Sequence, residues 1–254
     1  METENPTISI ENKIATITLN CPMKGNTLTP EILREIEDLF NKISKNKEVN
    51  VVVLTGGEKI FSAGFDLHYI KTLENESKEE FITLFLSTYR AIMSCTQPVI
   101  AAIAGAAFAG GFDLALMCDI RYASKTAKFS QREITLSITP FLDPLWRIIG
   151  FGRVKELALT GRIYDAYEAE RMGFVNKVFS EESLMENVRK IAHTIASYNR
   201  ECLKEVKNLA NLILNNNFNT YLDLQEINLR KFFGTIDYHT RINRLLKNLK
   251  ERKK

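Results

Sequence analysis

The sequence is poor in the residues that build metal sites and disulfide frameworks. Its 254 residues include only four cysteines and three histidines, and they form no CxxC pair. The cysteines are Cys21, Cys95, Cys118 and Cys202, and the histidines are His68, His193 and His239. Because these residues stand far apart without ligand spacing, we expect no metal site, no disulfide bonds and a reducing compartment.

Long apolar runs and a strong excess of one charge are also lacking. The most apolar stretch, Val99 to Phe112, is too short to span a bilayer and contains three glycines. The N-terminal segment 1–12 is polar and acidic, unlike a signal peptide. With 34 Lys+Arg against 31 Asp+Glu, the net charge is only +3, which is low for a general nucleic-acid binder. We therefore expect a cytoplasmic protein that neither spans a membrane nor binds nucleic acid.

The residues that are present predict an α/β fold. A hydrophobic share of 45% and a charged share of 26% fit a globular chain with a sizeable core. Strand and helix patterns alternate, which favours βαβ units and a mainly parallel sheet. We predict a hairpin over 8–18, helices over 29–43, 79–93 and 112–118, buried strands over 49–55 and 99–104, and a turn over 105–111. Thr29 is the expected cap of the first helix, with Pro30 in its first turn.

The composition changes near residue 183, beyond which the chain has one glycine and no proline. We predict a core over 1–190 and a helical oligomerisation region over 191–254. Two apolar sets lie in that region: Ile191, Ile195, Leu203, Val206, Leu209, Leu212, Ile213 and Leu214, and then Leu222, Leu224, Ile227, Leu229, Phe232, Phe233 and Ile236. Two or three isolated helices cannot bury this much apolar surface, so it must pack on the core or on another subunit. The basic end, 247–254, is typical of a solvated tail.

Two glycine-rich turns, 56–67 and 104–113, each follow a buried strand. Small residues let a ligand approach the backbone, and a helix start leaves N–H groups unpaired. Two such turns facing one point would supply a pair of donors to a developing oxyanion, although glycines also serve tight packing of strand on helix. The dinucleotide fingerprint GxGxxG, the phosphate loop GxxxxGK[ST] and the nucleophile elbow GxSxG are all absent from the sequence.

A series of segments follows one another in an order that matches a known family. The segments are Pro22–Leu28, Phe61–Leu67, Gln97–Gly105 with Gly110-Gly111, Cys118–Ala123, Phe129–Glu133, Leu159–Ala166 with Glu168-Ala169, and Gly173–Val175. Over nearly the whole chain they resemble the crotonase superfamily, also called the enoyl-CoA hydratase/isomerase family. The resemblance implies a crotonase-like spiral of ββα units with a C-terminal helical region. It also implies trimers, often paired into hexamers, and a fold that hosts many reactions on acyl-CoA thioesters.

The resemblance implies a catalytic site of two backbone donors and two acids. The N–H groups of Phe65 and Gly110 would form the oxyanion hole for the thioester oxygen, and the Phe65 ring would narrow the acyl pocket. Asp113 and Glu133 occupy the positions of the two acids that hydratases use to handle water and protons. Asp113 is one methylene shorter than the usual glutamate, and it is also suited to cap its helix.

The resemblance further places coenzyme A along the first glycine-rich turn. The implied substrate-binding residues are Lys24, Leu28, Ala63, Asp66, Leu67 and His68. Two interpretations of Lys24 stay open, contact with the CoA nucleotide or simple solvation. His68 fits the rim of the pocket better than a base, since nothing near it in sequence pairs with it. Coenzyme A enters as part of the substrate, so no separate cofactor is implied.

One segment departs from the family pattern. Hydratases usually carry a Pro-Gly-x-Gly-Gly stretch after the second acid, whereas this chain has the glycine-free segment Thr139–Arg147. Its bulky residues, Phe141, Leu142, Leu145 and Trp146, would reshape the acyl pocket. Asp143 in this segment is either an additional acid or base, or a loop cap beside Pro144.

The sequence thus leads to one expected function with alternatives. We expect an enoyl-CoA hydratase that adds water to a 2-enoyl-CoA through an oxyanion-stabilised thioester enolate. The alternatives are a Δ3,Δ2-enoyl-CoA isomerase, another enolate reaction such as decarboxylation, or a non-catalytic homologue that binds acyl-CoA or RNA. Both acids favour the hydratase, because isomerases of the family typically rely on one.

Overall fold

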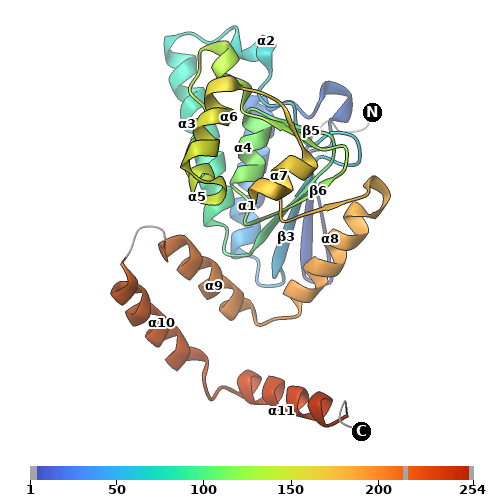
Figure 1. Ribbon diagram of the computed structural model, residues 1–254, viewed down its shortest axis with the longest axis vertical. Coiled ribbons are helices and arrows are strands. Elements are labelled where there is room, and N and C mark those ends of the chain that lie inside the picture. The colour runs from blue at the N-terminus through green and yellow to red at the C-terminus, as the bar shows by residue number, and fades with distance from the viewer. Residues whose placement is uncertain (1–4, 214–216, 252–254) are drawn as a thin grey trace. The chain divides into compact units, whose positions relative to one another are not determined.

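The computed structural model describes residues 5–213 and 217–251 (Figure 1). The chain divides into two compact units, Met1–Ala196 and Ser197–Lys254. No helix within the described residues is long and apolar enough to cross a membrane.

The first unit is built on a six-stranded sheet whose strand order is β1-β2-β3-β4-β6-β9. Its strands are β1 (Thr7–Glu11), β2 (Ile14–Thr18), β3 (Val51–Thr55), β4 (Val99–Ile103), β6 (Ile120–Ser124) and β9 (Lys177–Phe179). Strands β1 and β2 form the predicted antiparallel hairpin, and every later neighbour pairs in parallel. The predicted mainly parallel sheet is therefore confirmed.

A second, three-stranded sheet turns the chain into a spiral. It has the order β5-β7-β8, and its strands are β5 (Ala106–Phe108), β7 (Lys128–Ser130) and β8 (Tyr164–Asp165). Strand β4 lies in the large sheet, β5 in the small one, and helix α4 (Gly110–Leu116) follows them; β6, β7 and the 3-10 helix η2 (Arg132–Leu136) repeat this order. These are the predicted ββα units. The segment predicted only as a turn contains β5, because its pairing with β7 is non-local.

Helices cover both faces of the large sheet (Figure 1). Helices α1 (Pro30–Lys45), α3 (Asn75–Ser94) and α4 pack on one face, and α8 (Glu181–Ala196) packs on the other. Alternate residues of β3 serve the two cores: Val52 and Leu54 face one, and Val51 and Val53 face the other. Each such buried side chain contributes about 1.5–3 kcal/mol to stability. The remaining helices of this unit are η1 (Pro22–Lys24), α2 (Leu67–Ile70), α5 (Leu145–Ile149), α6 (Phe151–Thr160) and α7 (Ala166–Met172).

Helix α1 forms as its sequence predicts. The Thr29 side chain accepts a hydrogen bond from the Ile32 N–H, and Pro30 occupies the first helical position, where no N–H is needed. The apolar face that was predicted from helical spacing is buried at Ile32, Leu33, Ile36, Phe40 and Ile43. The helix thereby lays its apolar stripe against the sheet and against α3.

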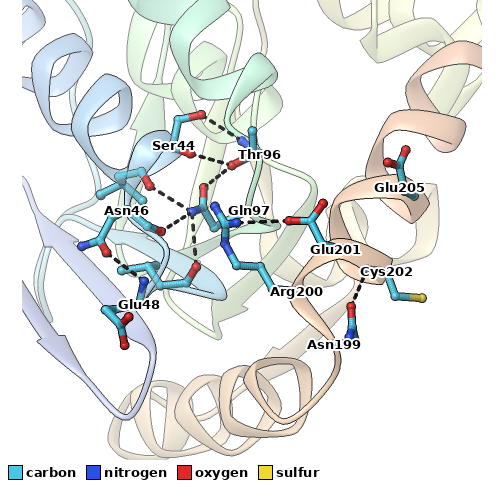
Figure 2. Close-up of polar contacts among 12 residues, drawn as sticks. Ser44, Asn46, Glu48, Thr96, Gln97, Asn199, Arg200, Glu201, Cys202 and Glu205 are labelled. Atoms are coloured by element: carbon cyan, nitrogen blue, oxygen red, sulfur yellow. Dashed lines mark hydrogen bonds and ion pairs between the residues drawn. The ribbon is translucent and has the colours of Figure 1, made fainter. Parts of the chain in front are cut away.

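Gln97, just before β4, ties the end of α1 to the segment that leads into β3 (Figure 2). Its Nε2 donates to the carbonyl oxygens of Ile43 at 2.9 Å, Val49 at 3.2 Å and Asn46 at 3.3 Å. Its Oε1 accepts a hydrogen bond from the Thr96 hydroxyl at 2.9 Å. A buried glutamine thus satisfies buried carbonyl groups that water cannot reach.

Arg121 on β6 fixes the far end of α4. Its guanidinium is buried and donates to the carbonyl oxygens of Ala115 at 3.3 Å and Leu116 at 3.4 Å, which are the last carbonyls of the helix. It also donates to the Phe174 carbonyl at 2.7 Å. A cation at this end complements the helix dipole and anchors the helix whose other end carries Gly110 and Asp113.

The second unit is helical within its described residues. It contains α9 (Arg200–Ile213), α10 (Phe218–Phe232) and α11 (Ile236–Glu251), and Asn199 caps α9 by accepting from the Cys202 N–H at 3.0 Å (Figure 2). An apolar groove of about 500 Å³ runs along α9 and α10. Many members of the two predicted apolar sets are exposed, including Val206, Ile227, Phe233 and Ile236. Leu214 of the first set, and residues 252–254 of the basic tail, lie outside the described residues.

The Gln97 bonds lead to a stability prediction. Gln97→Met keeps a long side chain but removes both donors, so buried carbonyl groups lose their partner. We expect the free energy of unfolding to fall by about 1–3 kcal/mol. Urea unfolding followed by circular dichroism measures it. The exposed Lys47→Met variant on the neighbouring turn is the control and should stay within about 0.5 kcal/mol of the unsubstituted protein. Equal stability of both variants would contradict this role of Gln97.

Candidate active site

The candidate site is shaped first by Asn26, a buried asparagine between η1 and α1. Its Nδ2 donates to the carbonyl oxygens of Gly56 and Ile60 at 2.8 Å and of Phe61 at 3.1 Å, and its Oδ1 accepts from the Cys21 N–H at 2.7 Å. Its φ of 48° is a left-handed conformation in which asparagine is enriched. Asn26 therefore holds the first glycine-rich turn in its folded shape through hydrogen bonds to three of its carbonyl groups.

Ser62 joins the first glycine-rich turn to the second. Its hydroxyl donates to the Asn26 carbonyl at 2.8 Å, while its N–H donates to the Ala106 carbonyl at 3.0 Å. Its own carbonyl accepts from the Phe108 N–H at 3.0 Å. A Cβ on Gly111 would lie 2.5 Å from that carbonyl oxygen, so the two turns can approach this closely only because residue 111 is glycine.

The close approach brings the two predicted backbone donors together. A Cβ on Gly64 would lie 2.8 Å from the Phe108 carbonyl and 3.3 Å from the Gly110 nitrogen, and Gly64 has a φ of 96°. Phe65 follows Gly64 directly. The N–H groups of Phe65 and Gly110 therefore lie on two backbone segments that run close together. Among the hydrogen bonds of the described residues, neither N–H acts as a donor.

Ala109 shows how tightly the second turn is held. It precedes α4 with a φ of 48° and a ψ of −126°, a conformation that side chains rarely adopt. Its N–H donates to the Ser130 carbonyl at 2.9 Å. Such backbone strain costs about 1–3 kcal/mol and persists only where the surrounding structure holds it, which is typical of functional sites.

An aromatic cluster lies beside Gly110. It consists of Phe65, Tyr69, Phe81, Phe85, Tyr89 and Phe141. The Phe65 ring lies 5.1 Å from the Phe81 ring and 5.2 Å from the Phe85 ring, measured between centroids. A Cβ on Gly110 would lie 3.0 Å from the Phe65 ring, so that ring rests against the bare backbone of Gly110. Aromatic rings thus confine the space beside the donor pair.

The two predicted acids are both buried next to this turn. Asp113 lies in the first turn of α4, and Glu133 lies in η2, just after β7 has paired with β5. Only 2% of Asp113 and 7% of Glu133 is exposed. Within the described residues, Asp113 Oδ1 and both carboxyl oxygens of Glu133 have no hydrogen-bond partner. Buried carboxyl oxygens without partners are costly for folding, which points to a function.

Burial makes both acids easier to protonate than usual. Desolvation raises the pKa of the Asp113 carboxyl well above its ordinary value, and the charge of Glu133 raises that pKa further. Burial also raises the pKa of the Glu133 carboxyl. Two neighbouring buried carboxyls with raised pKa values are candidates for groups that exchange protons with a substrate.

Tyr89, on α3, is a site residue that the sequence analysis missed. Its hydroxyl lies 3.4 Å from Asp113 Oδ2 and 3.4 Å from the Gly110 carbonyl oxygen, and its side chain is buried. The spacing of Phe81, Phe85 and Tyr89 on one face of α3 was visible in the sequence. A tyrosine in such an apolar stripe normally belongs to the core, and its meeting with α4 depends on a non-local crossing of helices.

Four of the predicted substrate-binding residues are exposed, Leu28 is buried and Asp66 is partly buried. Lys24, Ala63, Leu67 and His68 are exposed on η1, on the first glycine-rich turn and on α2. The Ala63 N–H donates to the Gly25 carbonyl at 2.8 Å, which places η1 beside that turn.

The other two predicted binding residues shape the backbone. Leu28 is fully buried; its N–H donates to the Gly64 carbonyl at 2.8 Å and its carbonyl accepts from the Asp66 N–H at 3.3 Å. The Asp66 carboxylate accepts from the Tyr69 N–H at 3.0 Å and so caps α2.

The glycine-free segment 139–147 contributes rings and a surface ion pair. The Phe141 ring packs 5.6 Å from the Tyr89 ring, and Leu145 is fully buried, whereas Leu142 and Trp146 are partly exposed. Asp143 is exposed and forms a two-bond ion pair with Arg147, with both distances at 2.9 Å. Arg147 lowers the pKa of the Asp143 carboxyl, so Asp143 acts as a partner within its own loop.

Metal ligands do not gather anywhere in the described part of the chain. No group of three or more histidine, cysteine, aspartate or glutamate side chains is placed to hold a metal ion there. The four cysteines, all within the described residues, form no disulfide bond.

Comparison with known proteins identifies the class to which this site belongs. Residues 9–253 match the sequence pattern described as Enoyl-CoA hydratase/isomerase, so the chain belongs to that family. A short-chain-enoyl-CoA hydratase from Clostridium acetobutylicum is 35% identical over 241 residues, which cover 93% of this chain and 92% of the relative. A crotonyl-CoA hydratase from Syntrophomonas wolfei is 37% identical over 215 residues, or 83% of each chain.

Solved structures agree with the assignment. The crystal structure of an enoyl-CoA hydratase from Bacillus anthracis superposes with a TM-score of 0.92 at 31% identity and covers 96% of both chains. The fold that the sequence resemblance implied, a crotonase-like spiral with C-terminal helices, is thereby confirmed.

The burial of Asp113 should make the stability of the protein depend on pH. The folded chain binds more protons than the unfolded chain between about pH 4, the ordinary pKa of aspartate, and the raised pKa of Asp113. The contribution of Asp113 to the free energy of unfolding therefore falls as pH rises through this window. Asp113→Asn escapes that loss, so its stability relative to the unsubstituted protein should improve by about 0.5–2 kcal/mol between pH 4.5 and 7.

Asp143→Asn is the matched control, because the pKa of Asp143 is lowered rather than raised. Its ionised form is the stabilising one above about pH 4, so this variant should be slightly less stable at pH 7 and should approach the unsubstituted protein as pH falls. Urea unfolding at several pH values measures both. A relative stability of Asp113→Asn that declines with rising pH would show that the ionised Asp113 is stabilised instead.

Proposed function

We propose that the chain is an enoyl-CoA hydratase that adds water across the double bond of a short 2-enoyl-CoA. The single observation that carries the proposal is the placement of two buried, incompletely partnered carboxyls, Asp113 and Glu133, beside the backbone N–H groups of Phe65 and Gly110. Two relatives that are named as hydratases, and that match this chain over most of their length, support the same reaction.

The proposed role of the two N–H groups is to bind the thioester carbonyl oxygen. Attack of water at the β-carbon moves electrons toward that oxygen, which becomes negative as an enolate forms. Donors that are fixed in advance stabilise the developing charge, and one such donor is worth about 3–4 kcal/mol in the transition state. The hydrogen bonds of Asn26 and Ser62 would hold these two donors in place before the substrate binds.

The proposed role of the two acids is to move protons. One carboxylate takes a proton from water while the water oxygen bonds to the β-carbon, and the other, protonated carboxyl gives its proton to the α-carbon. One water molecule is thereby added, and a proton passing between the acids restores the starting state. Raised pKa values favour this, since one of the two carboxyls must hold a proton near neutral pH.

The aromatic cluster supports a short acyl group. Rings from α3, from the first glycine-rich turn and from the segment 139–147 fill the region next to Gly110. We therefore expect a group as short as crotonyl to be preferred over a long acyl chain. The names of two relatives, short-chain-enoyl-CoA hydratase and crotonyl-CoA hydratase, agree with this choice.

Coenzyme A is proposed to lie along η1, the first glycine-rich turn and α2. Lys24, Ala63, Leu67 and His68 are exposed there and would contact it, while Leu28 and Asp66 hold the backbone in place. Coenzyme A arrives as part of the substrate, and the proposed hydration involves no net oxidation or reduction, so it calls for no redox cofactor. Four cysteines without a disulfide bond support the proposed cytoplasmic location.

Substitution of the acids tests the reaction. Glu133→Gln and Asp113→Asn keep the shape of the side chain but remove the exchangeable proton, so kcat should fall by about 10²–10⁴ for each. Loss of absorbance from the enoyl thioester of crotonyl-CoA measures it. The exposed Glu76→Gln on α3 is the control and should leave kcat unchanged.

Two outcomes of this assay would overturn the hydratase. One is no turnover by the unsubstituted protein with short, medium or branched 2-enoyl-CoA thioesters. The other is conversion of 3-enoyl-CoA to 2-enoyl-CoA that survives Asp113→Asn and is lost in Glu133→Gln, as an isomerase with a single acid requires.

The second unit supports a proposed trimer or hexamer. Its apolar groove and its exposed residues Val206, Ile227 and Phe233 offer a surface that further copies of the chain would cover. Sedimentation at low micromolar protein should give three or six times the monomer mass of 29.0 kDa. Ile227→Asp should shift the species toward the monomer, and Asn219→Asp on the same helix should not. A single 29.0 kDa species for the unsubstituted protein would contradict the proposal.

A further inference from the structure

Tyr89 is held in place by rings on both sides. Its ring centroid lies 5.7 Å from that of Phe85, one turn earlier on α3, and 5.6 Å from that of Phe141 in the glycine-free segment. Only 3% of the side chain is exposed. With its ring fixed in this way, the Tyr89 hydroxyl oxygen is held in one position.

The hydroxyl is directed at the shorter of the two acids. It lies 3.4 Å from Asp113 Oδ2 and equally far from the Gly110 carbonyl oxygen, and its single proton serves one of them at a time. Donation to an ionised carboxylate is stronger than donation to a neutral carbonyl, so ionisation of Asp113 draws the proton to Oδ2. Among the described residues, Tyr89 is the only hydrogen-bond partner that the Asp113 carboxyl has.

The Asp113 carboxyl gains a fixed orientation from this partner. Without one, rotation about the last side-chain bond of an aspartate is broad. A bond on Oδ2 fixes the plane of the carboxyl and leaves Oδ1 as the unpartnered oxygen. It also favours the ionised form, against the burial and the charge of Glu133 that favour the protonated form.

We propose that Tyr89 is a positioning residue that orients the Asp113 carboxyl through Oδ2 and so leaves Oδ1 as the oxygen that exchanges a proton. The inference rests on the proposed hydratase function for its catalytic consequence, but the hydrogen bond itself is a property of the protein without substrate. Among the described residues, two titratable side chains act on the Asp113 carboxyl: Glu133 through its charge and Tyr89 through its hydrogen bond.

Tyr89→Phe tests the proposal because it removes one oxygen atom and keeps the ring between Phe85 and Phe141. We expect kcat for crotonyl-CoA to fall at least 10-fold at pH 7 with KM changed less than threefold. The acidic limb of the kcat/KM profile should move to higher pH, because Asp113 without its donor protonates more easily, and part of the lost rate should return at high pH. In the Asp113→Asn background the same substitution should change the residual turnover less than twofold.

Tyr164→Phe is the matched control. It also removes a buried hydroxyl, one that has no partner among the described residues, and the charged groups that act on it are Arg162 and Glu168 rather than the two acids. Its kcat and pH profile should equal those of the unsubstituted protein. A Tyr89→Phe variant that behaves like Tyr164→Phe overturns the proposal. So does a rate loss that is equal at every pH and equally large in the Asp113→Asn background.

A second measurement separates this inference from the proposed function. Carbon-13 NMR of aspartate-labelled protein follows the Asp113 carboxyl, which is assigned by its absence in Asp113→Asn. Its titration should move to higher pH in Tyr89→Phe and stay in place in Tyr164→Phe. If the protein hydrates no enoyl-CoA but this titration moves, only the proposed function fails. If the titration stays in place, the positioning role fails whatever the activity.

Discussion

The hydrogen bonds of Asn26 and Ser62 are the constraint on which the rest of the site depends. Asn26 closes the first glycine-rich turn through three carbonyl groups, and Ser62 joins that turn to the second. The close approach of the backbones near Gly64 and Gly110 places Ala109 in a strained conformation. These hydrogen bonds help to offset the energetic cost of that strain. The donors are therefore fixed by the folding of the whole first unit rather than by a ligand.

The second design feature is the burial of two acids at a cost to stability. Buried carboxyl oxygens without partners weaken the fold, yet the same burial raises the pKa values of Asp113 and Glu133, so that both acids protonate more easily. The cores on both faces of the sheet compensate for this cost. Stability and reactivity thus depend on the same two residues in opposite directions.

Local signals made much of the fold predictable. The Thr29-Pro30 helix start, the hairpin and the buried strands β3 and β4 follow from neighbouring residues, and the motif order led to the ββα spiral. Strand β5 was missed because only its non-local pairing with β7 makes it a strand. In the site, the positions of Asp113 and Glu133 came from motif resemblance. The role of Tyr89 was hidden, because a tyrosine in an apolar stripe meets Asp113 only after α3 and α4 have packed.

In the proposed reaction the N–H groups of Phe65 and Gly110 polarise a thioester carbonyl beside the two acids. Difference infrared spectroscopy of crotonyl-CoA labelled with carbon-13 at the thioester carbonyl tests it most directly. The ligand would be bound to the Glu133→Gln variant so that it survives the measurement. Two hydrogen bonds to the oxygen weaken the C=O bond, so the labelled band should move to lower frequency than in free crotonyl-CoA. A band that stays at its solution frequency in the bound complex would contradict the account.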